Sequence, residues 1–126
     1  MTTAPEDYLS RVDRIATEVV AAHAARVDRE GAFPEEALAA LAREGLFGLI
    51  SSPDMGGLGQ GPRAAALVVE RLARECASTA MVVCMHYAGT AVIEKLGPAD
   101  VRRDIVAGKH LSTGPSFSIT AVIEKL

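Results

Sequence analysis

Residues 77–93 form an uninterrupted run without a formally charged side chain, ASTAMVVCMHYAGTAVI. A membrane-spanning helix needs about 20 predominantly apolar residues. This run is shorter, and Ser78, His86 and Thr90 make it more polar. A helix that is apolar on nearly every side is typical of the core of a helical domain. The run therefore predicts a buried central helix, from about Ser78 to Leu96, in an all-α protein with no membrane partner.

Amphipathic helices are predicted on both sides of this run. Apolar residues recur at three- and four-residue steps from residue 6 until Gly31, as on one face of a helix. The next helix starts near Pro34 and stops at Gly45. Two further helices are predicted over residues 62–77 and 98–108. We expect Leu38 and Leu41 to face the core and Phe33 and Leu46 to pack at the helix ends. The predicted fold is a compact multi-helix bundle, up-down or orthogonal.

Composition excludes several classes of partner and compartment. The chain has 126 residues and a formal net charge of −3, which suits one compact domain. It contains no run of Lys and Arg for binding nucleic acid. The N-terminus, MTTAPEDYLSRVDR, lacks the pattern of a secretion or import signal, so we expect a cytoplasmic protein. Cys76 and Cys84 lie in an apolar stretch and are predicted to be reduced, buried thiols.

A glycine-rich segment, LFGLISSPDMGGLGQGP, interrupts the helices at residues 46–62. Its apolar residues indicate a structured loop rather than a flexible linker. The dinucleotide-binding pattern G-x-G-x-x-G is not satisfied, because Gly57 and Gly59 are followed by Pro62 where the third glycine should stand. We therefore expect no phosphate site in this loop.

Catalytic and metal-binding patterns are absent from the sequence. The carboxylates lie among Arg and Lys on charged helix faces. The histidines His23, His86 and His110 fall on different elements, so neither a general base with a nucleophile nor a set of metal ligands is indicated. His86 follows an apolar run and is predicted to be a hydrogen-bonded core residue. We assign no catalytic residue and no metal ligand.

Three segments in order carry a resemblance to a known family. They are FPEEALAALAREGLFGLISSPDMGGLGQG, VVERLARECASTAMVVCMHY and LGPADVRRDIVAGKHLSTGPSFS. Together they resemble the amino-terminal part of the acyl-CoA dehydrogenases, over about residues 5–118. That family consists of flavoprotein oxidoreductases that remove two hydrogens across the α,β carbons of an acyl thioester and pass electrons from FAD to an acceptor. The resemblance implies a helical amino-terminal domain over residues 1–111 and the start of a middle β-domain over residues 112–118.

The resemblance also implies site residues. Ser78, Met81, Val82 and Met85 would wall the pocket for the acyl chain, where methionine offers an adaptable apolar surface. The alternative is that these four side chains fill the core of the domain itself. Residues 116–118, which are Ser116, Phe117 and Ser118, would contact the FAD.

The resemblance stops at Ile119, where the family has a glutamate. Residues 120–126, TAVIEKL, repeat residues 90–96 without any similarity between their flanks, so 119–126 is interpreted as an anomalous tail at a splice or truncation boundary. The middle β-barrel, the C-terminal domain and the family's usual catalytic glutamate would then be missing. We expect that this chain alone neither holds FAD tightly nor turns over acyl-CoA. The alternative is a non-catalytic helical module for interaction or oligomerisation, and a homo-oligomer is expected.

Overall fold

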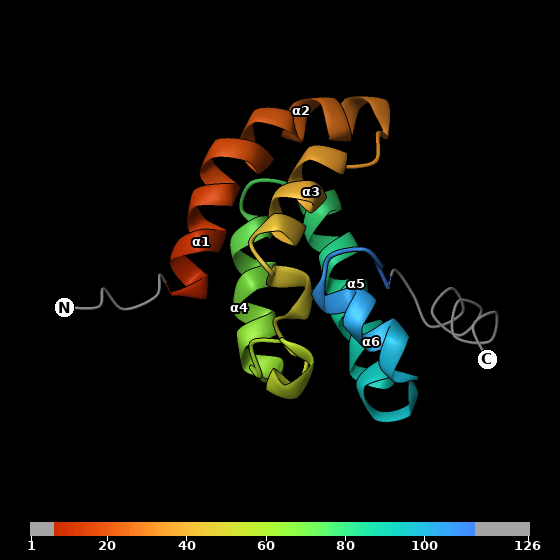
Figure 1. The fold of residues 1–126 in the computed structure, drawn as a ribbon. Coiled ribbons are helices and arrows are strands. Elements are labelled where there is room, and N and C mark those ends of the chain that lie inside the picture. The colour runs from red at the N-terminus through yellow and green to blue at the C-terminus, as the bar shows by residue number, and fades with distance from the viewer. Residues whose placement is uncertain (1–6, 113–126) are drawn as a thin grey trace.

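The computed structural model describes residues 7–112, and Figure 1 shows their arrangement. Within this range all regular structure is helical and no β-strand occurs. The all-α multi-helix fold predicted from the sequence is therefore confirmed. The α-helices are α1 (Tyr8–Ile15), α2 (Ala21–Glu30), α3 (Glu35–Arg43), α4 (Pro62–Ala73), α5 (Ala77–Leu96) and α6 (Ala99–Val106).

The first predicted helix is one continuous helix with a bend. A π-helical turn, Ala16–Val20, joins α1 to α2 without a break in helical dihedral angles. The chain changes direction there, so α2 lies across one end of the bundle (Figure 1). Single π-helical turns are a common cause of such bends. Gly31 ends α2 with a left-handed φ of 61°, where a glycine avoids steric cost.

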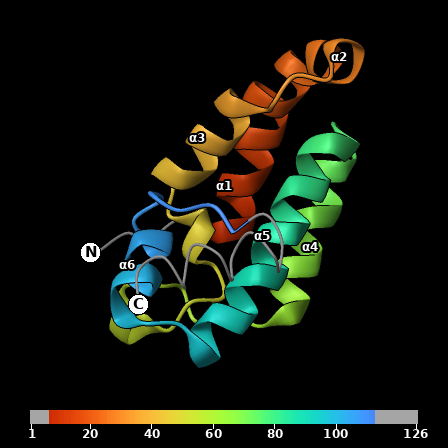
Figure 2. The same cartoon turned by 90° about the vertical axis from the view of Figure 1, so that its right-hand side faces the viewer.

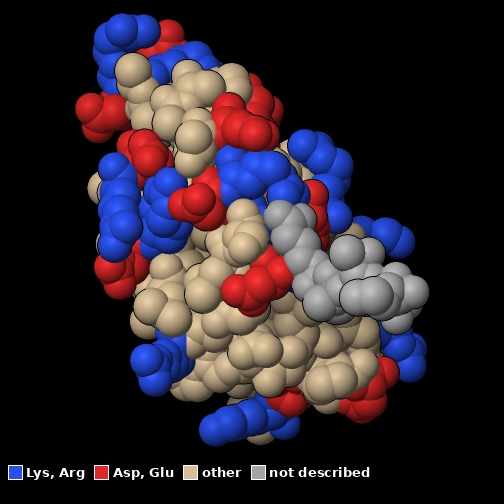
Figure 3. Space-filling model, turned by 90° about the vertical axis from the view of Figure 1, so that its left-hand side faces the viewer, with Lys and Arg blue, Asp and Glu red and all other residues tan. Residues whose placement is uncertain are grey.

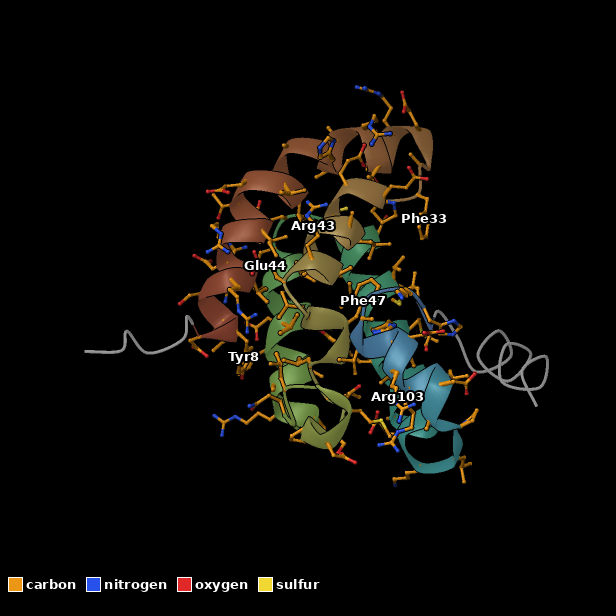
Figure 4. All side chains as sticks on the ribbon, viewed as in Figure 1. Tyr8, Phe33, Arg43, Glu44, Phe47 and Arg103 are labelled. Carbon is orange, nitrogen blue, oxygen red and sulfur yellow. The ribbon has the colours of Figure 1, made fainter. Side chains whose placement is uncertain are left out.

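Helix α3 begins after Pro34 and is followed by a left-handed Gly45, as predicted. Leu38, Leu41 and Leu46 are buried, because they face the main core shared by α1, α3, α4 and α5. Phe33 was expected to pack at the helix end, and this is wrong: 53% of its surface is exposed. It points outward from the turn between α2 and α3 (Figure 4). That turn lies at the outer end of the bundle, beyond the core (Figure 2).

Helices α4 and α5 form an antiparallel hairpin joined by residues 74–76 (Figures 1 and 2). Val68 and Leu72 of α4 face Ala80 and Val83 of α5, and all four side chains lie in the main core. The predicted extent of α5 is confirmed. Because none of the buried residues of α5 carries a formal charge, its inner face packs without ion pairs.

Helix α6 packs beside the second half of α5 through a small separate core of Ile93, Val101 and Ile105. At the edge of this contact, Arg102 donates to Glu94 at 2.9 Å, and both side chains are largely buried. Helix α6 also lies against the short 3₁₀ turn Leu46–Gly48, called η2. The described part of the chain ends shortly after α6, where the backbone N–H of Ser112 bonds to His86 of α5.

The glycine-rich segment is a tightly folded loop. Its amide N–H groups are used inside the loop, with N···O distances of 2.9–3.0 Å. A phosphate-binding loop needs several backbone N–H groups that are free to point at the anion. Four N–H groups are used inside this loop, so none of the four is free to bind an anion. The N–H groups of Gly57, Leu58, Gly59 and Gln60 donate to the carbonyl oxygens of Ser52, Gly48, Ser51 and Leu49, respectively.

Charged side chains of both signs are interleaved on the surface. On the face shown in Figure 3 they gather over one half, and blue and red groups alternate there instead of forming one basic patch. Ion pairs account for part of this pattern: Arg71 contacts Asp13 at 2.6 Å and Arg74 contacts Glu70 at 3.0 Å. The second pair has the i,i+4 spacing at which opposite charges on a helix interact. In the other half the middle is uncharged, and the charged groups lie around its rim.

Candidate functional site

Helix α5 has one buried and one exposed face, although both are apolar. Met81 is 62% exposed, Val92 47% and Leu96 82%, whereas Val83 and Ile93 on the opposite side are buried. The prediction of a helix buried on nearly every side is therefore wrong. The described helices pack against α5 from one side only, so its outer face lacks a covering element among residues 7–112.

An apolar groove runs along the outer side of the α4–α5 hairpin. Its volume is about 720 Å³, which lies within the usual range for small-molecule sites. We call it the α4/α5 groove. Charged residues line it only at its two ends, where Glu70 and the pair Glu94 and Lys95 lie. Small apolar side chains form its walls: Ala65, Ala66 and Val69 from α4, and Cys84, Ala88 and Ala91 from α5.

The four predicted acyl-pocket residues share one side of α5, because they follow the i, i+3, i+4, i+7 spacing. Ser78 and Met81 are exposed, and Val82 and Met85 are half-buried. Val82 packs against the main core. The alternative that these residues simply fill the core does not describe Ser78 or Met81. None of the four lines the α4/α5 groove, although Cys84, which does, follows Met81 by one helical turn.

Sequence reasoning missed the residues that line the groove. Cys84 was predicted to be buried, and it is exposed, whereas Cys76 is buried as predicted. The spacing of Cys84, Ala88 and Ala91 on α5 is that of one helix face. This signal was present in the sequence. It could not be separated from the apolar background, because the opposite face of α5 is equally apolar.

His86 lies at the centre of a buried polar network on the inner side of α5. Its side chain is fully buried, and Nε2 donates to the carbonyl oxygen of Phe47 at 2.9 Å. Nδ1 accepts from the backbone N–H of Ser112 at 3.0 Å. Burial lowers the pKa of His86 to about 4, so the ring is neutral at neutral pH. The predicted hydrogen-bonded core histidine is confirmed.

Tyr87 supports the same region from the next position of α5. Its hydroxyl donates to the carbonyl oxygen of Leu46 at 2.9 Å, and burial raises the pKa of that hydroxyl. The rings of His86 and Phe47 are in contact, with centroids 4.6 Å apart. The side chains of His86 and Tyr87 therefore attach the η2 turn to α5 by donating to the carbonyl oxygens of Phe47 and Leu46.

Glu94 supplies the polar end of the groove. Its Oε2 accepts from the backbone N–H of Ser52 at 3.2 Å and from Arg102 at 2.9 Å. Its Oε1 is buried without a hydrogen-bond partner among the described residues. This carboxylate is held in place by structural partners, so its geometry suits an anchor of α6 and the loop rather than a mobile general base.

The remaining predictions concern metal ions, the membrane, FAD and the end of the chain. Among residues 7–112 no cluster of His, Cys, Asp or Glu is placed to hold a metal ion. In the same range no helix is both long and apolar enough to cross a bilayer. The predicted FAD contacts, Ser116, Phe117 and Ser118, and the anomalous tail 119–126 lie outside the described residues. The division of the chain at residues 111 and 112 stays a prediction.

Fold and groove together define the class: an all-α domain that turns one apolar helix face outward. The family comparison is more specific. The family described as "Acyl-CoA dehydrogenase, N-terminal domain" matches residues 2–108. This chain belongs to that family, and the resemblance found in the sequence is confirmed.

Curated relatives agree with the family assignment. The chain is 34% identical over 105 residues to "Probable acyl-CoA dehydrogenase fadE25" of Mycobacterium leprae, covering 81% of this chain and 27% of the relative. It is 30% identical over 122 residues to "3-sulfinopropanoyl-CoA desulfinase" of Paraburkholderia xenovorans, covering 95% of this chain and 31% of the relative. It is 32% identical over 94 residues to "Cyclohex-1-ene-1-carbonyl-CoA dehydrogenase" of Geobacter metallireducens, covering 75% of this chain and 25% of the relative.

The chain thus spans between a quarter and a third of the length of these relatives. No solved structure gives a significant match to it.

Proposed function

We propose that this chain is the amino-terminal domain of an FAD-dependent acyl-CoA dehydrogenase, in which it forms part of the wall of the acyl pocket. The α4/α5 groove with the adjoining side of α5 is the observation that carries this proposal. All three relatives described above are named for reactions of CoA thioesters. In a cell we expect the domain in the cytoplasm, as part of fatty-acid metabolism.

The groove has the chemistry that an acyl chain requires. Alkyl groups gain free energy on transfer from water to an apolar surface, at roughly 25 cal/mol per Å². Ala88 and Ala91 leave space above α5, and Met81, about two helical turns before Ala88, is exposed and flexible enough to follow chains of different shape. The charged ends of the groove at Glu70 and Lys95 would confine an alkyl group to the stretch between them. The four residues predicted from the sequence would extend this wall along α5.

Dehydrogenation itself requires groups that the described residues do not provide. A base must reach the proton on the α carbon, and no carboxylate or histidine of residues 7–112 is both unengaged and directed into the apolar part of the groove. FAD would receive the hydride when bound, and we propose Ser116, Phe117 and Ser118 as contacts to it. The purified chain is expected to be colourless and inactive with acyl-CoA, FAD and a dye acceptor. Visible flavin absorbance after gel filtration would contradict this expectation.

A second copy of the chain is the alternative occupant of the groove. Glu70 lies toward one end of the groove and Lys95 lies at the other. A two-fold axis across the groove would bring Lys95 of one copy opposite Glu70 of the other, as an isologous interface requires. The chain would then act as a non-catalytic oligomerisation module. This alternative explains the same exposed apolar surface without any ligand.

The reactivity of Cys84 tests both occupants, because this thiol lines the groove whereas Cys76 is buried. We expect octanoyl-CoA to slow the labelling of Cys84 by a maleimide several-fold, and acetyl-CoA to slow it much less. The difference arises because only the longer chain can cover the thiol. Mass spectrometry identifies the labelled cysteine.

Two variants control this measurement. Cys84→Ser should remove the fast-labelling thiol, and Ala88→Asp should abolish the effect of octanoyl-CoA by placing a charge in the apolar wall. Equal protection by both thioesters, or none by octanoyl-CoA, would contradict the acyl-wall proposal. Protection that grows with protein concentration alone, together with a doubled mass in solution, would favour the second copy.

A further inference from the structure

The segment that follows α6 is attached to the helical domain by the packing of Leu111 against the main core and by a hydrogen bond from Ser112 to one side chain. Ser112 is fully buried, and its backbone N–H donates to Nδ1 of His86 across 26 residues of sequence. The other ring nitrogen of His86 donates to Phe47 in η2. A single imidazole thus connects three segments: α5, the η2 turn and the chain just after α6.

These two contacts determine the tautomer of the ring. An imidazole nitrogen that accepts a hydrogen bond carries no proton, and a nitrogen that donates to a carbonyl must carry one. His86 is therefore neutral with its proton on Nε2. Nδ1 holds the segment after α6 and Nε2 holds the η2 turn. Loss of the acceptor would therefore release the first segment, and loss of the donor would release the second.

We propose that His86 is a positioning residue that fixes where the chain leaves the helical domain. The consequence concerns residues 116–118, and this part rests on the proposed function, in which they contact the flavin. Four residues span at most about 14 Å, so the place of Ser112 limits the places that Ser116 can reach. Release of Ser112 from His86 would loosen this restriction, leaving only the packing of Leu111 against the core beside it, without disturbing α4 or the first half of α5.

A packing role alone is the competing explanation, because the His86 ring also contacts the ring of Phe47 at 4.6 Å. Tyr87 offers a matched control. It lies next to His86 on α5, is buried and bonds to the same turn through Leu46, yet no hydrogen bond connects its side chain to Ser112. Tyr87→Phe should therefore weaken the attachment of η2 without affecting the exit of the chain.

Hydrogen exchange at the Ser112 amide tests the proposal in this chain, without flavin or substrate. In His86→Gln the longer amide can still donate to Phe47, but the acceptor for Ser112 is lost; we expect protection of Ser112 to fall by about tenfold or more relative to amides of α4. In His86→Asn the shorter side chain places an oxygen near the Nδ1 position, so protection of Ser112 should be largely retained. Tyr87→Phe should leave the ratio of Ser112 to α4 protection unchanged.

Equal effects of His86→Gln and Tyr87→Phe on that ratio would overturn the proposal. Should a His86 variant not fold, nitrogen-15 NMR of the unmodified chain gives an independent answer: Nε2 should carry the proton, and a proton found on Nδ1 would refute the contact to Ser112. Neither measurement depends on acyl-CoA. A failure of the acyl-wall experiment is therefore distinguishable from a failure here.

Discussion

Replacing Gly57 with alanine is expected to lower the free energy of unfolding by about 3 kcal/mol or more, at the upper end of the range for overpacked sites. A β carbon at residue 57 would lie 2.2 Å from the carbonyl oxygen of Ser51 and 2.6 Å from its Cβ. Ser51 is fully buried, and its carbonyl accepts the N–H of Gly59. Relief would therefore require the folded loop to open. Urea titration followed by circular dichroism measures the loss.

Gly61→Ala is the matched control within the same loop. No heavy atom lies within 4 Å of the position of its β carbon, and its φ of −106° suits any residue. We expect a loss below about 1 kcal/mol, mainly because Gly61 caps α4 and alanine is a poorer cap. Similar losses in the two variants would show that the close contact at Gly57 does not limit the stability of the loop.

The stability of the domain is expected to fall by about 3 kcal/mol between pH 6.5 and pH 4 because of His86 alone. Its pKa is lowered from 6.5 to about 4, first by burial and then by the charge of His110. Each pKa unit corresponds to 1.36 kcal/mol. In this pH window the unfolded chain binds a proton that the folded chain excludes, so stability increases with pH and is complete above the unfolded pKa.

His86→Asn should flatten this pH dependence, since it removes the titrating group. Free energies of unfolding at pH 4, 5, 6 and 7 from urea titrations provide the comparison. Carboxylates contribute at the acid end in both proteins; Glu36, for example, has its pKa lowered from 4.5, mainly by a backbone hydrogen bond. An unchanged slope between pH 5 and 6.5 in the variant would assign the pH dependence to groups other than His86.

Local patterns in the sequence were sufficient to place the helices. The periodicity up to Gly31, the stops at Gly31 and Gly45, and the extent of α5 follow from side-chain spacing and glycine conformation. These properties depend on residues within a few turns of one another. The π-helical bend at Ala16–Val20 was not predicted, because the apolar steps continue through it.

The candidate site was predicted only in part. Ser78, Met81, Val82 and Met85 were assigned from a family resemblance, and the structure places them on one side of α5. Which side of an apolar helix faces outward depends on where its neighbours pack, and residues 77–93 contain no charge that would mark it. The exposure of Cys84 was mispredicted for the same reason, whereas Phe33 is exposed because its turn lies beyond the core.

By itself the sequence determined an all-α domain, the approximate extent of its helices apart from the bend at Ala16–Val20, and its family. Only the tertiary structure decided that α4 and α5 expose a shared groove and that His86 bonds to Ser112. The physical reason is the range of the interactions. Helix formation depends on contacts three or four residues apart. The groove instead lies between two helices, and the His86 network joins groups 39 and 26 residues apart, so both exist only after the helices have packed.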